Sequence, residues 1–234
     1  MDPLASIAAE PGATGLFLDI DGVLAPIVPR PEDARVPDAT RDELRRLARE
    51  YLLVACVTGR DSAVAREIVG VPELTYVGEH GLELDPRARE WGPRIHAFAA
   101  AARWPEERKP FSVAFHYRTA TDQEVARATL EAIAADALAQ GFRTRWGRLV
   151  LEVLPPVDAS KGTAVRSLLE ETGLRRALYA GDDVTDLDGF AALDGLDLAV
   201  RVAVVSAEGP SELAERADVR VSDPSAFLEL LRKL

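Results

Sequence analysis

Short apolar runs alternate with amphipathic segments along the first third of the chain. The runs with the length and apolar content of buried strands lie at 16–18, 52–57 and 75–77. Between the first two, Leu44, Leu47 and Ala48 recur at helical spacing, and we expect Asp38 or Thr40 to cap this helix. Strand, helix, strand and helix in this order predict right-handed crossovers and a parallel sheet.

A different pattern occupies the middle of the chain, from 83 to 157. Apolar and polar residues alternate over 112–118 and 149–153, and helical patterns cover 94–103 and 122–139. Two alternating strands separated by a helix predict a small α+β lobe whose sheet is covered on one face. We therefore expect a separate, inserted domain here.

The last part of the chain returns to the first pattern. A helix is expected from Lys161 through Glu171, and a final helix is expected to end at Leu234. Strands are expected near Leu178, Val202 and Val219. The segments 1–82 and 158–234 together predict an α/β core built on a parallel sheet, and 83–157 form the smaller α+β insertion.

The composition is that of a globular protein, and its charge argues against some kinds of partner. The chain has 234 residues, 47% apolar and 29% charged, and its 28 Lys and Arg against 39 Asp and Glu give a net charge of −11. This excess argues against nucleic acid and anionic membrane as bulk partners, although it does not oppose a phosphate held at a local site. The single cysteine, Cys56, lies inside an apolar run and is expected in the core. With no apolar stretch of about 18 residues and no targeting pattern, a cytoplasmic location is expected.

Two carboxylates, Asp19 and Asp21, stand one residue apart where the first apolar run ends. The carboxyl end of a parallel strand is where open α/β sheets place their active sites. Two like charges at such a position repel each other and lose hydration, so a cation is expected between them. Hard oxygen ligands with no Cys or His beside them favour Mg²⁺, which commonly accompanies a substrate phosphate.

Three further polar motifs follow, and the ordered set resembles the haloacid dehalogenase superfamily of phosphohydrolases. The motifs are Thr58-Gly59-Arg60, Lys161-Gly162 and Gly181-Asp182-Asp183-Val184-Thr185-Asp186. The resemblance implies a Rossmann-like core, and the position of the insertion matches what this superfamily calls a C2-type cap. We expect this cap to determine substrate specificity and to close over the bound substrate.

The resemblance also implies catalytic roles for individual residues. Asp19 matches the nucleophile, which would form an aspartyl phosphate, and Asp21 matches the general acid/base. Thr58 matches the hydroxyl that binds phosphate, and Gly59 would let backbone N–H groups approach the phosphate. Lys161 matches the lysine that neutralises the phosphate. From the residues alone, Lys161 is also consistent with a solvated lysine at a helix start.

A Mg²⁺ site is implied by the same resemblance. The ligands would be the carboxylate of Asp19, the backbone carbonyl of Asp21 and the carboxylate of Asp182, with waters completing the octahedron. Asp186 falls on the acidic position that supports the lysine and the metal site. Asp183 either binds the metal through water or caps the helix that follows.

A second set of motifs resembles the trehalose-6-phosphate phosphatases. It consists of Gly78-Glu79-His80-Gly81, the stretch KPFSVAFHYR at 109–118, and Leu151-Glu152-Val153-Leu154-Pro155. Carboxylate, imidazole and guanidinium groups suit a disaccharide rich in hydroxyls. The residues implied in substrate binding are Gly59, Arg60, Glu79, His80, Lys109, His116, Arg118 and Glu152. The implied partners are a sugar phosphate and, functionally, a trehalose-phosphate synthase.

The residues by themselves leave alternatives for the cap. Glu152 is either a sugar contact or an outward-facing residue of an alternating strand. His80 and His116 are either substrate contacts or structural histidines. Lys109 and Arg118 are either substrate contacts or surface charges.

Two departures from the family pattern bear on the substrate. Leu154 stands where relatives commonly carry Arg, and Leu187 where they carry Glu; Arg145 or Arg148 would be the substitute for the missing cation. Without a substitute, the substrate would be another sugar phosphate, such as sucrose phosphate or a glucosyl or mannosyl glycerate phosphate. A phosphotransferase and a non-catalytic regulatory domain are the remaining alternatives, although two clustered carboxylates have no structural reason to persist in the latter.

Overall fold

The computed structural model describes residues 2–147, 149–206 and 209–234, and the chain divides into two compact units. One unit, the core, consists of Met1–Gly81 and Ala159–Leu234, and the other, the cap, of Leu82–Asp158. Each boundary lies one residue from the position expected from the sequence. No helix among the described residues is both long and apolar enough to span a membrane.

The core contains the following elements in chain order: α1 (Pro3–Ala8), η1 (Pro11–Ala13), β1 (Gly15–Leu18), η2 (Pro31–Asp33), α2 (Asp38–Glu50), β2 (Leu53–Val57), α3 (Ser62–Val69), β3 (Thr75–Val77), α6 (Lys161–Thr172), β8 (Arg176–Gly181), α7 (Asp186–Ala192), β9 (Leu198–Val204), α8 (Ser211–Arg216), β10 (Val219–Val221) and α9 (Pro224–Leu231). The 3₁₀ segment η3 (Glu79–Leu84) continues the chain into the cap. The cap contains α4 (Ala88–Ala102), β4 (Glu107–Arg108), β5 (Val113–His116), α5 (Gln123–Ala139), β6 (Arg143–Gly147) and β7 (Val150–Leu154).

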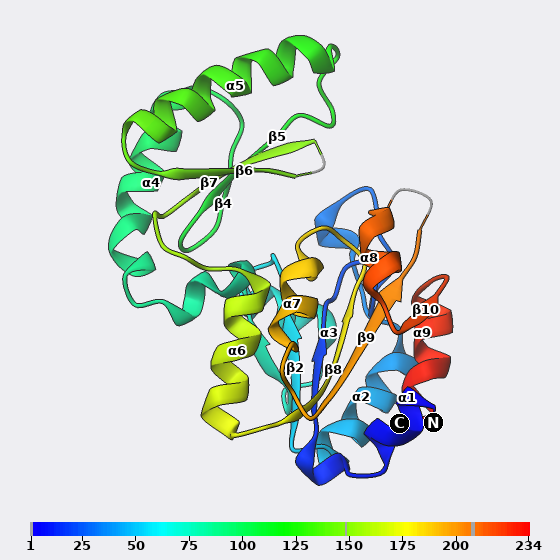
Figure 1. Cartoon of the computed structure of the whole chain (residues 1–234). Coiled ribbons are helices and arrows are strands. Elements are labelled where there is room, and N and C mark those ends of the chain that lie inside the picture. The colour runs from blue at the N-terminus through cyan, green and yellow to red at the C-terminus, as the bar shows by residue number, and fades with distance from the viewer. Residues whose placement is uncertain (1, 148, 207–208) are drawn as a thin grey trace. The chain divides into compact units, whose positions relative to one another are not determined.

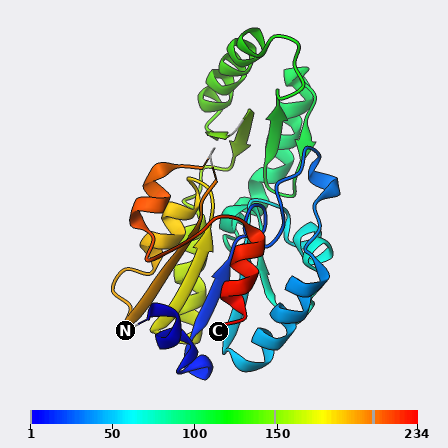
Figure 2. The same cartoon turned by 90° about the vertical axis from the view of Figure 1, so that its right-hand side faces the viewer.

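The core is a six-stranded sheet in the order β10-β9-β8-β1-β2-β3, and all neighbouring strands are parallel (Figure 1). Apolar side chains of α1, α2, α3 and α9 pack on one face of the sheet, and those of α6, α7 and α8 pack on the other. The two helical layers are seen on either side of the strands in Figure 2. Because both faces are covered, the central strands β1 and β2 are continuous apolar runs. The predicted α/β class is confirmed.

The register of the three central strands brings their carboxyl ends level. Leu18 of β1 is aligned with Cys56 of β2 on one side and with Ala180 of β8 on the other. The residues that follow these strands therefore emerge along one edge of the sheet. Cys56 is fully buried in the core, as predicted.

Two helix ends in the core differ from the sequence predictions. Helix α2 begins at Asp38, and Pro37 precedes it without any side-chain cap, so neither Asp38 nor Thr40 is the capping residue. Asp38 lies in the first turn, where the positive end of the helix dipole stabilises its negative charge. The last helix ends at Leu231 and not at Leu234.

The cap is a four-stranded antiparallel sheet in the order β4-β5-β7-β6, with α4 and α5 packed on one face. The sequence pattern predicted two of these strands, β5 and β7. It missed β4 and β6 because their residues are exposed or only partly buried and lack an apolar alternation. Helix α4 begins earlier than expected, at Ala88.

The other face of the cap sheet has no helix of the cap packed on it among the described residues. Phe115, Leu151 and Val153 contribute to the apolar cluster with the helices. Their strand neighbours point the opposite way, since side chains alternate along a strand. In register across the four strands, this opposite face carries Glu107, Ala114, Glu152 and Arg145.

Candidate active site

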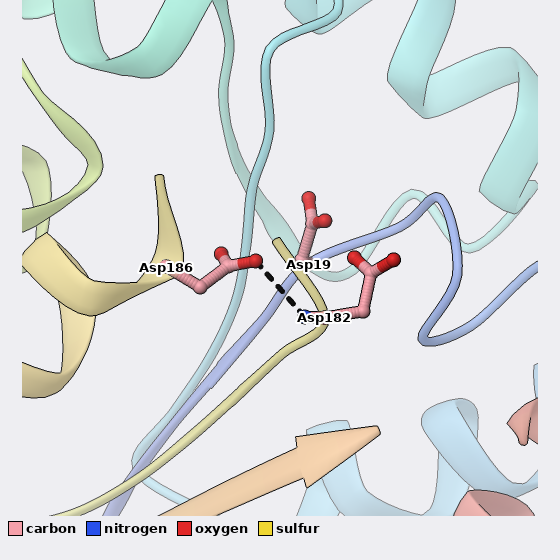
Figure 3. Close-up of side chains that lie close together, drawn as sticks. All are labelled: Asp19, Asp182 and Asp186. Atoms are coloured by element: carbon pink, nitrogen blue, oxygen red, sulfur yellow. Dashed lines mark hydrogen bonds between the residues drawn. The ribbon is translucent and has the colours of Figure 1, made fainter. Parts of the chain in front are cut away.

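Three carboxylates meet at the carboxyl edge of the core sheet. Asp19 follows β1, Asp182 follows β8, and Asp186 begins α7 (Figure 3). Each offers an oxygen atom that lies within 4.8 Å of an oxygen of the other two. The level register of β1 and β8 places the first two side by side, which agrees with the pairing that the resemblance to the haloacid dehalogenase superfamily implied.

Asp186 is the centre of the hydrogen-bond network. Its Oδ1 accepts hydrogen bonds from Lys161 Nζ at 2.6 Å and from the Tyr179 hydroxyl at 2.7 Å. Its Oδ2 accepts from the backbone N–H groups of Asp182 at 3.0 Å and Asp183 at 2.9 Å. An ionised carboxylate has about four acceptor positions. With four donors already in place, Asp186 is the most fully hydrogen-bonded of the three carboxylates, as expected for a residue that supports the site.

Lys161 links Asp186 to Asp19. It is the first residue of α6, whose start is fixed by a reciprocal capping pair between Ser160 and Thr163. Its Nζ lies 3.0 Å from Asp19 Oδ1 as well as 2.6 Å from Asp186 Oδ1, and the side chain is 2% exposed. Burial alone would lower the pKa of Lys161, but the carboxylates of Asp186 and Asp19 outweigh it and raise that pKa. The alternative of a solvated lysine is wrong.

The site is electrostatically suited to a divalent cation. Burial raises the pKa of Asp19 to about 7, although Lys161 opposes this rise. Burial, with the nearby carboxylates of Asp19 and Asp186, raises the pKa of Asp182 to about 9. Without a cation, the ionised forms of these carboxylates are unfavourable. A bound divalent cation would stabilise the ionised forms. The donors are all oxygen, which is the chemistry that Mg²⁺ prefers.

Gly22 gives Asp182 the space it needs. The backbone of Gly22 has a φ of +85°, and a Cβ at this position would lie 2.1 Å from Oδ2 of Asp182. A side chain here would thus be strained and would displace a candidate metal ligand. The Asp-x-Asp-Gly sequence therefore serves the site on two counts, through its carboxylates and through the missing side chain of its glycine.

Asp21 is held by Arg60 in a two-point contact. Arg60 Nε donates to Asp21 Oδ2 at 2.6 Å, and Arg60 Nη2 donates to Asp21 Oδ1 at 2.7 Å. A third donor, Arg60 Nη1, binds the backbone carbonyl of Pro31 at 3.0 Å. The sequence analysis expected Arg60 to bind substrate. In the structure, its guanidinium lies on Asp21.

The loop after β2 is braced by the turn at Gly78–Gly81. Thr58, which is buried, accepts the N–H of His80 on its carbonyl at 2.9 Å, and the carbonyl of Arg60 accepts the N–H of Glu79 at 2.8 Å. A Cβ on Gly59 would lie 2.4 Å from Nε2 of His80, so the imidazole packs directly on the glycine backbone. Glu79 and His80 both have positive φ, at 45° and 54°. Two consecutive left-handed residues other than glycine cost about 1–3 kcal/mol each, and such strain is concentrated at functional sites.

Glu152 in the cap is neither isolated nor solvated. Its Oε1 accepts from Lys109 Nζ at 3.1 Å, and its Oε2 accepts from Arg145 Nε at 2.8 Å and Nη2 at 2.6 Å. Glu152 is 8% exposed and lies on the face opposite the cap helices. Arg145 thus supplies a cation beside Glu152 in a chain that has Leu154 at the arginine position. The other proposed substitute, Arg148, lies outside the described residues.

Of the remaining predicted residues, His116 is linked to the face of the cap sheet that carries Glu152 through Glu107. His116 is about half exposed, and its Nε2 lies 2.6 Å from Glu107 Oε2. Arg118 is exposed in the turn after β5. Asp183 is exposed and accepts the N–H of Val184, while the residue before α7 is Thr185, so the predicted helix cap at Asp183 is wrong. Leu187 packs partly buried against the core.

The sequence analysis missed Tyr179 and Glu107. Tyr179 lies within the apolar strand β8 and is fully buried, so its sequence context indicates a core residue. Only its hydroxyl, which binds Asp186, indicates a role in the site. The pattern of apolar residues in a strand does not predict which group a buried hydroxyl will contact. Glu107 lies in a two-residue strand that has no pattern of its own.

The family model for trehalose-phosphatases matches residues 17–102 and 105–225 of this chain. The chain belongs to the trehalose-phosphatase family. The family model covers each of the core motifs, so the predicted relationship is confirmed. Members named trehalose-phosphate phosphatase are enzymes that hydrolyse phosphate esters.

Curated relatives of this chain are longer than it is. An uncharacterized glycosyl hydrolase of Mycobacterium tuberculosis is 35% identical over 212 residues, which is 80% of this chain and 16% of that protein. The trehalose-phosphate phosphatase of Mycobacterium avium is 36% identical over 225 residues, covering 82% of this chain and 56% of its own length. The chain thus spans about half or less of these curated relatives. The C-terminal domain of trehalose-6-phosphate phosphatase from C. albicans has the same fold, with a TM-score of 0.76, 22% identity, and coverage of 99% and 96% of the two chains.

Proposed function

We propose that this protein is a Mg²⁺-dependent phosphatase that hydrolyses trehalose 6-phosphate through an aspartyl phosphate on Asp19. The single observation that carries the proposal is the buried contact of Lys161 with both Asp19 and Asp186. It orients one carboxylate at the end of β1 and keeps a positive charge where a phosphate would arrive. Membership of the trehalose-phosphatase family supports the choice of sugar phosphate.

The reaction has two displacement steps. In the first, a carboxylate oxygen of Asp19 bonds to phosphorus as the bond from phosphorus to the sugar oxygen breaks, and Asp21 gives its proton to that oxygen. In the second, Asp21 takes a proton from a water whose oxygen bonds to phosphorus, and the bond to Asp19 breaks, releasing inorganic phosphate. Lys161 and the Thr58 hydroxyl bind the phosphate oxygens, and the fixed positive charge of the lysine offsets the charge of the dianion.

The residues that would hold Mg²⁺ are the carboxylates of Asp19 and Asp182 and the backbone carbonyl of Asp21. Asp186 would orient this set through the N–H group of Asp182, with which it makes a 3.0 Å hydrogen bond. When bound, the cation would neutralise part of the negative charge on the phosphate. Supporting residues of this kind are expected to matter nearly as much as the ligands themselves.

The cap residues are proposed as the sugar-binding groups. Lys109, Glu152 and Arg145 form one charged cluster with donors and acceptors suited to hydroxyl groups. Glu79, His80, His116 and Arg118 remain proposed contacts of the same kind. Leu154 favours a second candidate, in which the substrate is sucrose phosphate or a glucosyl or mannosyl glycerate phosphate. A cytoplasmic location and a functional pairing with a trehalose-phosphate synthase also remain proposals.

The test is phosphate release with Mg²⁺ from a panel of sugar phosphates. The panel holds trehalose 6-phosphate, sucrose 6-phosphate, glucose 6-phosphate and mannosyl-3-phosphoglycerate, with Asp19→Asn as the blank. We expect a strong preference for trehalose 6-phosphate that is lost in the variant. Activity on another member alone would reject the sugar assignment, and activity on none would favour a regulatory domain.

A further inference from the structure

The two-point contact between Arg60 and Asp21 indicates a role for Arg60 other than substrate binding. The guanidinium presents two parallel N–H donors, at 2.6 and 2.7 Å, to the two carboxylate oxygens of Asp21. Two parallel hydrogen bonds restrict rotation of a carboxylate about its own axis, which a single contact does not. We propose that Arg60 is a positioning residue that aims the carboxyl group of Asp21 for its proton transfers; this rests on the proposed function.

The remaining contacts of Arg60 show why it holds a fixed place. Its Nη1 binds the Pro31 carbonyl at 3.0 Å, and its backbone N–H donates to the Thr58 hydroxyl oxygen at 3.2 Å. Its side chain is 16% exposed, less than half the exposure of Asp21, which is 36%. Arg60 therefore joins the end of β2, the loop around Pro31 and the segment after β1. Asp21, which is the more exposed partner, depends on Arg60 for its orientation.

The proposal predicts which parts of the reaction change when Arg60 is replaced. Asp21 moves a proton in both displacement steps, but an aryl phosphate has a leaving group that departs without protonation. If the carboxyl group of Asp21 loses its orientation, both steps should slow with a sugar phosphate. With an aryl phosphate, only the hydrolysis of the aspartyl phosphate should slow. General acid–base assistance typically contributes about 10²–10⁴-fold.

The experiment compares trehalose 6-phosphate with p-nitrophenyl phosphate in steady-state and rapid-mixing kinetics of the full chain with Mg²⁺. The variants are Arg60→Met, which removes the guanidinium, and Arg60→Lys, which keeps a charge but not the paired donors. Arg66→Met is the matched control. Arg66 lies in α3, binds the Pro72 carbonyl and stacks on Tyr76, apart from the catalytic groups.

For Arg60→Met we expect kcat/KM on trehalose 6-phosphate to fall about 10²-fold or more. On p-nitrophenyl phosphate we expect kcat and KM to fall together, with kcat/KM nearly unchanged and a burst of nitrophenol matching the enzyme concentration. This pattern arises because kcat/KM reports the first step and kcat the second. Arg60→Lys should recover part of the loss, and Arg66→Met should resemble the wild type.

Two results would overturn the proposal. Equal loss of kcat/KM on both substrates without a burst would assign Arg60 a general structural role. A raised KM with an unchanged kcat would make it a substrate contact. Failure of the proposed function is recognised separately, since the wild type would then release no phosphate from trehalose 6-phosphate. If the wild type prefers another sugar phosphate, that ester takes its place in the comparison.

Discussion

The hydroxyl of Tyr179 donates a 2.7 Å hydrogen bond to Oδ1 of Asp186, inside the core and out of reach of solvent. The ring of Tyr179 packs edge-on against Phe190, and Gly189 leaves room for it, since a Cβ there would lie 2.2 Å from the ring. A strand residue thus fixes the carboxylate that in turn orients Lys161. The position of the charged site is set by packing on the apolar face below it.

We expect Tyr179→Phe to lower the stability of the protein by about 1.5–3 kcal/mol, the usual range for a hydrogen bond to a charged group. The aromatic packing is retained, so the loss isolates the hydroxyl. Tyr76→Phe is the matched control, because its hydroxyl binds the neutral carbonyl of Val71; there we expect about 0.5–1.5 kcal/mol. Urea unfolding measures both. Equal losses in the two variants would show that Asp186 does not depend on this hydroxyl.

Metal-free protein should become less stable as the pH rises from about 4 to about 9. Burial raises the pKa values of Asp19 and Asp182 from the usual 3.8 to about 7 and about 9, so the folded state binds more protons than the unfolded state across this window. Their contribution to the free energy of unfolding is therefore present at low pH and lost as the pH rises through the folded pKa values.

Thermal unfolding with and without Mg²⁺ at several pH values tests this dependence. The stabilisation by Mg²⁺ should grow with pH, since the ligands must lose their protons to bind the cation. Asp182→Asn should weaken both trends. A Mg²⁺ effect that is constant from pH 5 to pH 9 would contradict the assignment of these carboxylates as ligands.

Gly22→Ala should abolish most Mg²⁺-dependent activity. The new Cβ would overlap Oδ2 of Asp182 at 2.1 Å, in a backbone with a φ of +85°. Gly141→Ala separates the two causes, because Gly141 has a φ of +84° and nothing within 4 Å of its Cβ position. Both variants carry the backbone strain, of order 1 kcal/mol, and only the first disturbs the ligand. Titration of activity with Mg²⁺ should show weaker Mg²⁺ binding in Gly22→Ala alone. Urea unfolding should show a similar loss of stability from backbone strain in both variants.

Glu152→Gln should raise KM for trehalose 6-phosphate about tenfold or more, as expected for the loss of a charged hydrogen-bonding group worth about 1.5–3 kcal/mol. The activity on p-nitrophenyl phosphate, which has no sugar, should stay near the wild-type value. Glu131→Gln on the exposed side of α5 is the control, since Glu131 pairs there with Arg127. Equal effects on the two substrates would show that Glu152 stabilises the cap and does not bind the sugar.

The core was more predictable from the sequence than the cap. Asp19 and Asp182 end apolar strands, and the rule that parallel strands place their functional groups at one edge predicts that both lie at that edge, while their pairing was implied by the family resemblance. Glu152 shows where this reasoning stops. Its position in an alternating strand predicts the face it occupies, but its partner Arg145 lies on β6, a strand without apolar periodicity. The same holds for Arg60. Its sequence context predicts that it lies in the loop after a strand, but not that its guanidinium contacts Asp21.

Charge balance at the edge of the core sheet has a consequence for the order of events. When ionised, the carboxylates of Asp19, Asp182 and Asp186 exceed the single ammonium of Lys161 by two charges. A divalent cation restores neutrality, whereas a phosphate dianion that arrives first meets a field of its own sign. The cation is therefore expected to enter before the ester and to remain until inorganic phosphate has left, so that turnover follows a fixed sequence set by electroneutrality.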